Sequence, residues 1–348
     1  MRDILILFAI ILLLGSCKNE ANNEVLRVSP DGETSVNNKL SGIVIEKPPL
    51  TVRFVDNSER YFHISDSYAS GMNGIASLIH ADQRKNIFST VGMNLECTRT
   101  HPKYGKLKDE GLAPRIGDMK MEQIDSVTVK YTQIGKDVSG LNMEMLFKVG
   151  DSYIDETIST WPDHDIEYSS SFFASYMNQV QNTSIFLRTP GKDEDKKQWL
   201  EIASAGHGAD DGIGVFGRPY NPFGMKWHEH LKDNPLLRQA RIETPETKLA
   251  TFDAGFSKYP SKKMDYFYYG LVDDYLYLMI FQESDFIFWI SASGNGTVRQ
   301  PAWDYEFKTG PQKANERRNF HVRLVYKPFV SIEDVLDEVS RFQNEAVE

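Results

Sequence analysis

Several short stretches of the sequence carry side chains that can exchange protons or hold a polar ligand. They contain Glu96, Arg99 and His101, then Arg115, the aromatic run with Tyr176 and Asn178, the glycine-flanked His207, and the adjacent Trp303 and Asp304. On a strand, Tyr176 and Asn178 would point to the same side. Arginine and amide groups can neutralise a ligand carboxylate, whereas histidine and tyrosine can accept or donate protons. These residue types predict acid–base chemistry on a small polar substrate.

His207 is the first candidate for proton transfer. It stands between Gly206 and Gly208, so no neighbouring side chain would cover its imidazole. The alternative is a loop histidine without a task. Tyr176 and His101 are the other candidates for taking or giving the proton.

Trp303 and Asp304 follow a glycine-containing polar loop that starts near residue 291. Such a loop lies at the surface and lets a ligand approach the backbone closely. An aromatic ring beside a carboxylate is suited to a sugar, because the ring packs on the pyranose C–H face and the acid orients hydroxyls. The alternative is a core tryptophan beside a solvated aspartate.

Paired carboxylates offer a different chemistry. Glu96 with Asp304 or with Asp165 could form the acid and base of a glycoside hydrolase, but the sequence does not give their separation. The sequence has no P-loop, no nucleotide-binding glycine loop and no GxSxG motif, so no cofactor is expected.

Two further patterns remain open. His228 and His230, together with Glu229 or His207, could bind a divalent ion, but no spacing fixes a third ligand, so no metal is assigned. Cys97 is either a nucleophile paired with a histidine or a small buried residue. No known cysteine-enzyme signature surrounds it, which favours burial.

Composition and charge limit the class of protein. The 348-residue chain is 41% hydrophobic and 12% aromatic, as in a globular protein, and its formal net charge is −10. No basic run could neutralise phosphates, which argues against a nucleic-acid partner.

The N-terminus has the pattern of a bacterial lipoprotein signal. Residues 1–16 contain an apolar core too short to span a bilayer, and residues 14–17 resemble a lipobox that ends at Cys17. We therefore expect lipid modification of Cys17, a flexible tether over residues 17–40, and a lipid anchor in the outer membrane. The outer-membrane assignment rests on the lysine at position 18, by family analogy.

Residues 41–348 are predicted to form one all-β domain. Short runs of strand type, several with alternating polarity, predict mostly antiparallel pairing in two packed sheets. These runs cover 51–55, 126–132, 141–149, 152–160, 183–187, 275–281, 285–290 and 319–326. Gly150 and Asp151 predict a hairpin, and we also expect the runs at 275–281 and 285–290 to pair as a hairpin. A short helix with Ser331 as its N-cap is predicted near the C-terminus.

Residues 71–80, 85–88 and 92–96, with the sequences GMNGIASLIH, KNIF and GMNLE, resemble the opening of galactose-mutarotase-like β-supersandwich proteins. The epimerase set of a His-x-Tyr-Phe-Asn histidine and a late glutamate is not visible in the sequence. Residues 173–178, 206–208 and 294–304 resemble secreted proteins of polysaccharide-utilisation systems, including dehydratases of ulvan oligosaccharides. This resemblance implies a two-sheet supersandwich and an oligosaccharide partner.

The resemblance and the residue types together predict a lyase or dehydratase that acts across C4–C5 of a uronic acid. Arg99, Arg115 and Asn178 would neutralise the uronate carboxylate, and Glu96, Trp303 and Asp304 would contact the sugar. A histidine or tyrosine would remove the C5 proton. The alternatives are a glycoside hydrolase and a non-catalytic glycan-binding lipoprotein.

Overall fold

The structure is a computed structural model that describes residues 42–58, 60–65, 68–102, 108–109, 113–134, 140–190, 196–204, 215–231, 265–282, 286–292 and 300–345. The predicted signal and tether, and with them Cys17, lie outside the described residues. So does His207.

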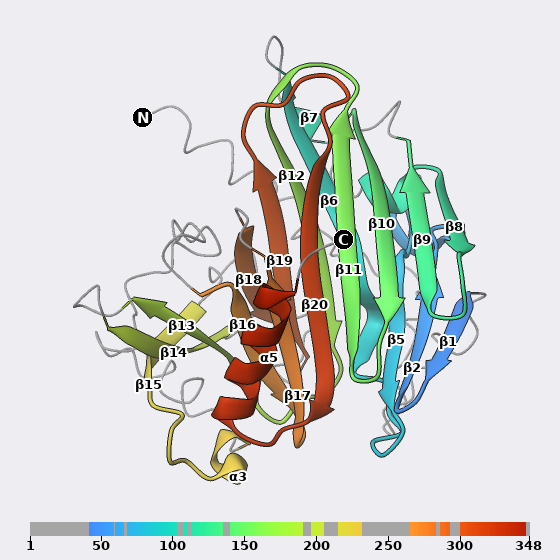
Figure 1. Ribbon diagram of the computed structural model, residues 1–348. Coiled ribbons are helices and arrows are strands. Elements are labelled where there is room, and N and C mark those ends of the chain that lie inside the picture. Colours follow the sequence, from blue (N-terminus) through green and yellow to red (C-terminus); the bar gives the residue numbers. More distant parts are fainter. Residues whose placement is uncertain are drawn as a thin grey trace.

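Two antiparallel sheets form the body of the molecule (Figure 1). The eight-stranded sheet has the order β1-β2-β5-β6-β12-β19-β18, with β7 paired to β6. Its strands are β1 (Ile43–Lys47), β2 (Leu50–Val55), β5 (Gly74–His80), β6 (Phe88–Pro102), β7 (Lys108–Asp109), β12 (Ile166–Met177), β18 (Phe286–Ala292) and β19 (Pro301–Thr309). The long strands β6, β12 and β19 lie side by side within this sheet.

The ten-stranded sheet has the order β15-β14-β13-β16-β17-β20-β11-β10-β9-β8. Its strands are β8 (Met119–Gln123), β9 (Thr128–Gln133), β10 (Leu141–Val149), β11 (Tyr153–Pro162), β13 (Ile185–Pro190), β14 (Lys197–Ser204), β15 (Val215–Tyr220), β16 (Phe267–Val272), β17 (Tyr275–Phe281) and β20 (Arg318–Pro328). A separate hairpin of β3 (Arg60–Ser65) and β4 (Tyr68–Gly71) completes the strands. The helices are α2 (Ala113–Ile116), α3 (Trp227–His230) and α5 (Ile332–Asn344).

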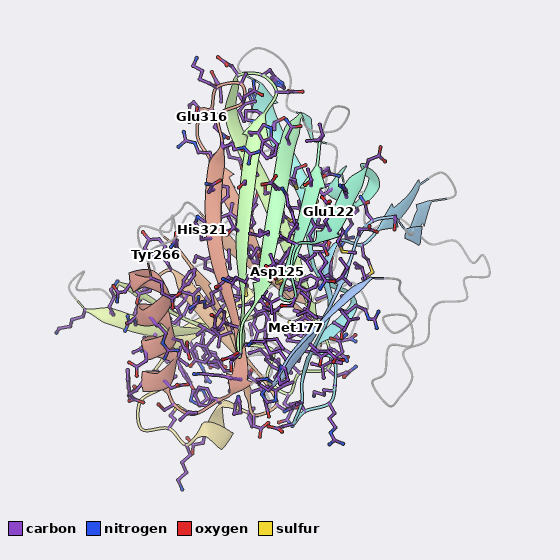
Figure 2. The ribbon with its side chains drawn as sticks, turned by 45° about the vertical axis from the view of Figure 1, so that its right-hand side comes forward. Glu122, Asp125, Met177, Tyr266, Glu316 and His321 are labelled. Atoms are coloured by element: carbon purple, nitrogen blue, oxygen red, sulfur yellow. The ribbon has the colours of Figure 1, made fainter. Side chains whose placement is uncertain are left out.

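The main core lies between the two sheets and contains inward-facing side chains of both. In β19, Trp303, Tyr305 and Phe307 belong to this core, so the residues between them face the other side of the sheet. Figure 2 shows the side chains that fill the space between the sheets, among them the buried Met177. The alternation in β19 thus gives the eight-stranded sheet one apolar and one largely polar face.

A second apolar cluster covers the outer face of the ten-stranded sheet. Leu276, Leu278 and Ile280 of β17 pack there with apolar residues of α5, while alternate residues of the same strand enter the main core. All seven residues of β17 are therefore buried. Ser331 caps α5, because its side chain accepts a hydrogen bond from the N–H of Asp334, as the sequence predicts.

The observed architecture confirms the predicted fold class: mostly β, with two antiparallel sheets and one C-terminal helix. The hairpin at Gly150 and Asp151 is confirmed by the pairing of β10 with β11. The predicted pairing of residues 275–281 with 285–290 is wrong. β17 pairs with β16 and β20 in one sheet, whereas β18 pairs with β19 in the other. The apolar run of β17 reflects burial on both faces, which does not require β18 as its neighbour.

Within the described part of the chain, no helix has the length and apolar character needed to cross a membrane.

Candidate functional site

The polar face of the eight-stranded sheet carries most of the predicted site residues. Directly paired residues of neighbouring strands share a face of the sheet. Arg99 pairs with Ser170 and then with Lys308 across β6, β12 and β19. Since the core residues Leu95, Phe173 and Tyr305 occupy the opposite face, the polar side chains of these three strands meet on the outer side.

Glu96 lies at a β-bulge in β6. The register pairs Phe172 with Cys97 and Phe173 with Leu95, so Glu96 has no direct partner on β12. A bulge of this kind changes the direction of a side chain relative to regular alternation. Alternation from the core residue Leu95 already turns the carboxylate of Glu96 to the polar side, where it meets Arg115 and Tyr176, and the bulge shifts the register for Cys97 and the residues after it.

Arg115 reaches Glu96 from the short helix α2. The carbonyl oxygen of Pro114 accepts bonds from Asn57 Nδ2 at 2.9 Å and Asn73 Nδ2 at 3.4 Å, which holds α2 against β6. The guanidinium donates from Nη2 to Glu96 Oε2 at 3.0 Å and from Nε to Asn94 Oδ1 at 2.9 Å. Arg115 is only 6% exposed, so this pair is held in a defined geometry.

Tyr176 contributes a hydroxyl to the same carboxylate. Its Oη donates to Glu96 Oε2 at 3.1 Å, so Oε2 accepts from both Tyr176 and Arg115. Among the described residues, both of these donors bind Oε2 and neither binds Oε1 of Glu96. Burial raises the pKa of Tyr176 well above its ordinary value, and the negative charge of Glu96 adds to this. Tyr176 is therefore a proton donor in the resting site.

Asp304 is a second carboxyl group behind Glu96. Its Oδ1 accepts the backbone N–H of Ser175 at 2.8 Å, and the residue is 6% exposed. Burial raises the pKa of Asp304 well above its ordinary value, and Glu96 adds to this, although the Ser175 N–H and Arg115 oppose it. Burial therefore favours the neutral form of the Asp304 carboxyl group. We call Asn94, Glu96, Arg115, Tyr176 and Asp304 the Glu96 cluster.

A second polar group lies farther along the same face. Arg99 follows Glu96 by three residues on β6, which places it about 10 Å farther along the strand. Its Nη1 is 3.8 Å from Glu306 Oε1, and its side chain is 24% exposed. His101 pairs with Tyr168, whose pKa burial raises to about 12 with a further contribution from Glu306.

Apart from Trp303, the structure separates the described predicted site residues into three places. Glu96, Arg115, Tyr176 and Asp304 come together, and Arg99 and His101 follow on the same face at increasing distance. Asn178 lies just beyond the end of β12, where its amide Nδ2 donates to the carbonyl of Asn86 at 3.3 Å.

Trp303 is placed in the core, contrary to its predicted role as a sugar platform. It is 0% exposed, its indole N–H donates to the carbonyl of Thr183 at 3.2 Å, and its ring lies 5.4 Å from that of Tyr277. Adjacent strand residues face opposite sides, so Trp303 and Asp304 cannot both face one ligand. The alternative of a core tryptophan describes the structure, but Asp304 is buried and not solvated.

The other candidate pairs also separate in space. Asp165 accepts from Lys313 Nζ at 2.9 Å and from the N–H of Ala314 at 3.0 Å, in contacts that do not involve the Glu96 cluster. Cys97 is half-buried and pairs with Phe172. No group of three or more His, Cys, Asp or Glu residues that could hold a metal occurs among the described residues. His230 instead contacts Tyr220.

Sequence reasoning did not assign Glu306 or Tyr168, and it did not assign Asn94 a role. Glu306 is two residues beyond Asp304 on the same strand, so strand alternation could have predicted their common face. Asn94 precedes Glu96 by two residues, but its contact with Arg115 depends on where α2 docks.

No protein-family model and no curated protein matches the sequence. Among solved structures, a galactose mutarotase-like protein from Lactobacillus casei ATCC 334 is similar over 82% of this chain and 100% of its own, at 9% identity and a TM-score of 0.47. A galactose 1-epimerase from Lactobacillus acidophilus NCFM matches 83% of this chain and 95% of its own, at 8% identity and a TM-score of 0.42. An α-N-acetylgalactosaminidase from Bifidobacterium bifidum matches 87% of this chain and 39% of its own, at 11% identity and a TM-score of 0.45. The chemistry of the Glu96 cluster is inferred from its own contacts.

Proposed function

We propose that the protein is a carbohydrate-active lyase or dehydratase, and that Glu96 and Tyr176, with Arg115 beside them, are its proton-transfer centre. The substrate class is an oligosaccharide with a terminal or internal uronic acid, such as a fragment of ulvan. The observation that carries this proposal is the hydrogen bond from the hydroxyl of Tyr176 to Glu96 Oε2, beside the guanidinium of Arg115.

The bond between Tyr176 and Glu96 supports a balanced elimination. Glu96 Oε1 accepts the C5 proton of the uronate, a double bond forms between C4 and C5, and the bond from C4 to oxygen breaks. Tyr176 then donates its proton to the leaving oxygen, which departs as water or as a sugar hydroxyl. The carboxyl group of Glu96 then turns so that its proton faces the Tyr176 oxygen, 3.1 Å from Oε2 in the resting site, and the proton returns to Tyr176, which restores both groups.

Arginine side chains on the polar face of the eight-stranded sheet support the same reaction. Abstraction of the C5 proton places negative charge on the uronate carboxylate, which a nearby cation stabilises. Arg99 is 24% exposed and supplies this cation in our proposal, while Arg115 is held by Glu96 and Asn94 and orients the base. The sequence prediction gave both arginines one task, and the geometry favours different tasks for them.

A glycoside hydrolase is the second candidate, and the burial of Asp304 favours it. Burial raises the pKa of Asp304 and so favours the acid form that a proton donor needs, and Glu96 would be its partner carboxylate. In that mechanism Asp304 would protonate the glycosidic oxygen. Elimination gives Asp304 no proton to transfer.

Products and one matched pair of variants distinguish the candidates. The protein is incubated with ulvan fragments and other uronate oligosaccharides, and ultraviolet absorbance of the unsaturated product is followed beside release of reducing ends. Elimination predicts rising absorbance, a loss of about 10²- to 10⁴-fold in Glu96→Gln, and nearly unchanged rates in the isosteric Asp304→Asn. Reducing ends without absorbance, together with loss of activity in Asp304→Asn, would establish the hydrolase instead. If no product forms with any such substrate, both candidates are contradicted.

We also propose that lipid on Cys17 anchors the protein in the outer membrane, where oligosaccharides reach it. The supporting observation is the lipobox-like sequence at residues 14–17. In cells fed labelled palmitate, the wild type should carry label in the outer-membrane fraction and Cys17→Ser should not. Label retained by Cys17→Ser would contradict the anchor.

A further inference from the structure

One row of side chains crosses the polar face of the eight-stranded sheet and contains two cations. Arg99 of β6, Ser170 of β12 and Lys308 of β19 are direct partners in the register, so their side chains leave the sheet on the same side. Neighbouring strands are about 4.8 Å apart, which places the backbones of the two basic residues about 10 Å from each other. The row is therefore a local concentration of positive charge in a protein whose formal net charge is −10.

The two cations differ in their surroundings. Arg99 Nη1 lies 3.8 Å from Oε1 of the buried Glu306. Lys308 is half-buried, and its Nζ lies 5.9 Å from the centre of the Tyr168 ring, within the range of a cation–π contact. Within the described ranges, no carboxylate forms an ion pair with Lys308. The ammonium of Lys308 is therefore held over the face by an aromatic ring and keeps its charge for an anionic ligand.

Tyr168 adds a hydroxyl group beside this ammonium. Burial raises the pKa of Tyr168 to about 12, with a further contribution from Glu306, while Ser170 and Arg99 oppose the shift. The hydroxyl is therefore protonated at ordinary pH and can donate a hydrogen bond. An ammonium next to a neutral hydroxyl donor suits an oxygen anion, such as a carboxylate or a sulfate.

Lys308 lies too far from Glu96 to hold the same sugar. It is three residues farther along the face and two strands across, which separates the two backbones by about 14 Å. Arg99, which we propose stabilises the uronate carboxylate, lies between them. The row before Arg99 contains Phe172, whose half-buried ring gives the intervening surface an apolar patch on which a pyranose C–H face can pack. An oligosaccharide with its uronate at Glu96 can therefore place a neighbouring residue at Lys308.

We propose that Lys308 and Tyr168 form a second anion subsite on this face, for a carboxylate or sulfate carried by a sugar next to the reacting uronate. The subsite depends on the proposed function, because the position of Glu96 defines where the uronate lies. It narrows the substrate class to oligosaccharides with acidic groups on neighbouring residues. Lys308 binds this group and takes no part in proton transfer.

Three disaccharides that differ in one substituent test the subsite. Cellobiouronic acid, a glucuronate linked to glucose, has a neutral neighbour. Its sulfate ester on the glucose hydroxymethyl group carries a sulfate there, and the disaccharide of two glucuronates carries a carboxylate there. Isothermal titration calorimetry with Glu96→Gln measures the affinities without significant turnover. We expect at least one charged ligand to bind about tenfold more tightly than cellobiouronic acid, and the ligand that gains identifies the anion.

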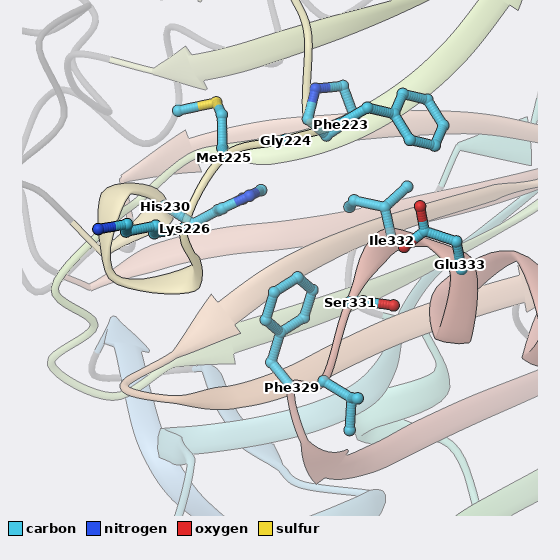
Figure 3. A pocket seen from close by; sticks show the side chains of 11 residues that line it. Phe223, Gly224, Met225, Lys226, His230, Phe329, Ser331, Ile332 and Glu333 are labelled. Atoms are coloured by element: carbon cyan, nitrogen blue, oxygen red, sulfur yellow. The ribbon is translucent and has the colours of Figure 1, made fainter.

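Matched lysine variants locate the charge that produces this gain. Lys308→Ala should remove the gain and leave the affinity for cellobiouronic acid within about twofold, whereas Lys308→Arg keeps a cation over Tyr168 and should retain the gain. Lys226→Ala is the control. It removes the same charge beside the cavity of about 340 Å³ at α3 and the start of α5, where Figure 3 shows Lys226 directed away from the hollow. All three affinities should stay unchanged in this control.

The outcomes separate the subsite from the proposed elimination. If the wild type eliminates but Lys308→Ala keeps the gain, the subsite is overturned and the elimination stands. If no elimination product forms while Lys308→Ala loses the gain, the subsite stands as part of a binding face and the elimination falls. Equal affinities for the three disaccharides, no binding of any of them, or loss of the gain in Lys226→Ala would also overturn the subsite.

Discussion

Glu156 should make the stability of the fold depend on pH in a predictable way. It lies on β11, is 2% exposed, and faces the core between the sheets. Its Oε2 accepts from the hydroxyl of Tyr305 at 2.7 Å, which links the two sheets, while Oε1 has no hydrogen-bond partner among the described residues. We predict that Glu156→Gln, which keeps the shape and the acceptor for Tyr305, removes most of this pH dependence.

The magnitude follows from the pKa of the buried carboxyl group. Burial raises the pKa of Glu156 from 4.5 to about 8, although the bond from Tyr305 opposes this. Between these values the folded state holds a proton that the unfolded state has released, so the free energy of unfolding falls as pH rises. The slope is about 1.4 kcal/mol per pH unit, which amounts to about 3 kcal/mol lost by pH 7 relative to pH below 4.5.

Urea denaturation at several pH values between 5 and 8 measures this effect. The difference in free energy of unfolding between Glu156→Gln and wild type should grow with pH, by about 1.4 kcal/mol per unit. Glu122→Gln, at a half-buried position labelled in Figure 2, makes the same chemical change on a side chain that is 40% exposed and should show no such growth with pH. A difference that stays constant from pH 5 to 8 would refute the reasoning, because Glu156 would then titrate equally in both states.

Three other variants test the packing, the helix and the site. Gly270→Ala should lower the free energy of unfolding by about 1 to 3 kcal/mol in urea denaturation, because its Cβ would lie 2.3 Å from the Trp303 ring. Gly310→Ala is the control, because its Cβ would have nothing within 4 Å. Equal stabilities of the two variants would contradict the packing. Ser331→Ala should lower the free energy of unfolding by about 1 kcal/mol, since it removes the cap of α5, and no change would show that the cap contributes nothing. Asn94→Ala should lower kcat on uronate substrates by about tenfold with less change in KM, because Arg115 loses a contact that orients it; an unchanged kcat would exclude this positioning role.

The sequence predicts where the strands lie better than it predicts which strands pair with one another. The alternation and turn residues around Gly150 give β10, β11 and their hairpin correctly. The runs that become β17 and β18 are equally clear as strands, but their periodicity does not say which sheet each joins. The long-range pairings of β17 with β20 and of β18 with β19 decide this, and a local pattern contains no information on them.

The candidate site likewise has features that a local pattern predicts and features that depend on long-range packing. Alternation in β19 was enough to separate Trp303 from Asp304, because the flanking apolar residues Tyr305 and Phe307 share the face of the tryptophan. The bulge at Glu96, which shifts the register of the residues after it, was not predictable from the sequence, since it depends on how β6 and β12 align over many residues. The approach of Arg115 depends on the docking of α2, which the amide side chains of Asn57 and Asn73 fix from a turn and a connection distant in sequence.

The rate of uronate elimination by Glu96→Gln tests the central claim most directly. This variant keeps the size of the side chain and removes the base between Tyr176 and Arg115. We predict a fall of about 10²-fold or more in formation of the unsaturated product, with Glu122→Gln at the wild-type rate. Wild-type activity in a folded Glu96→Gln protein would contradict the assignment of proton transfer to this carboxylate.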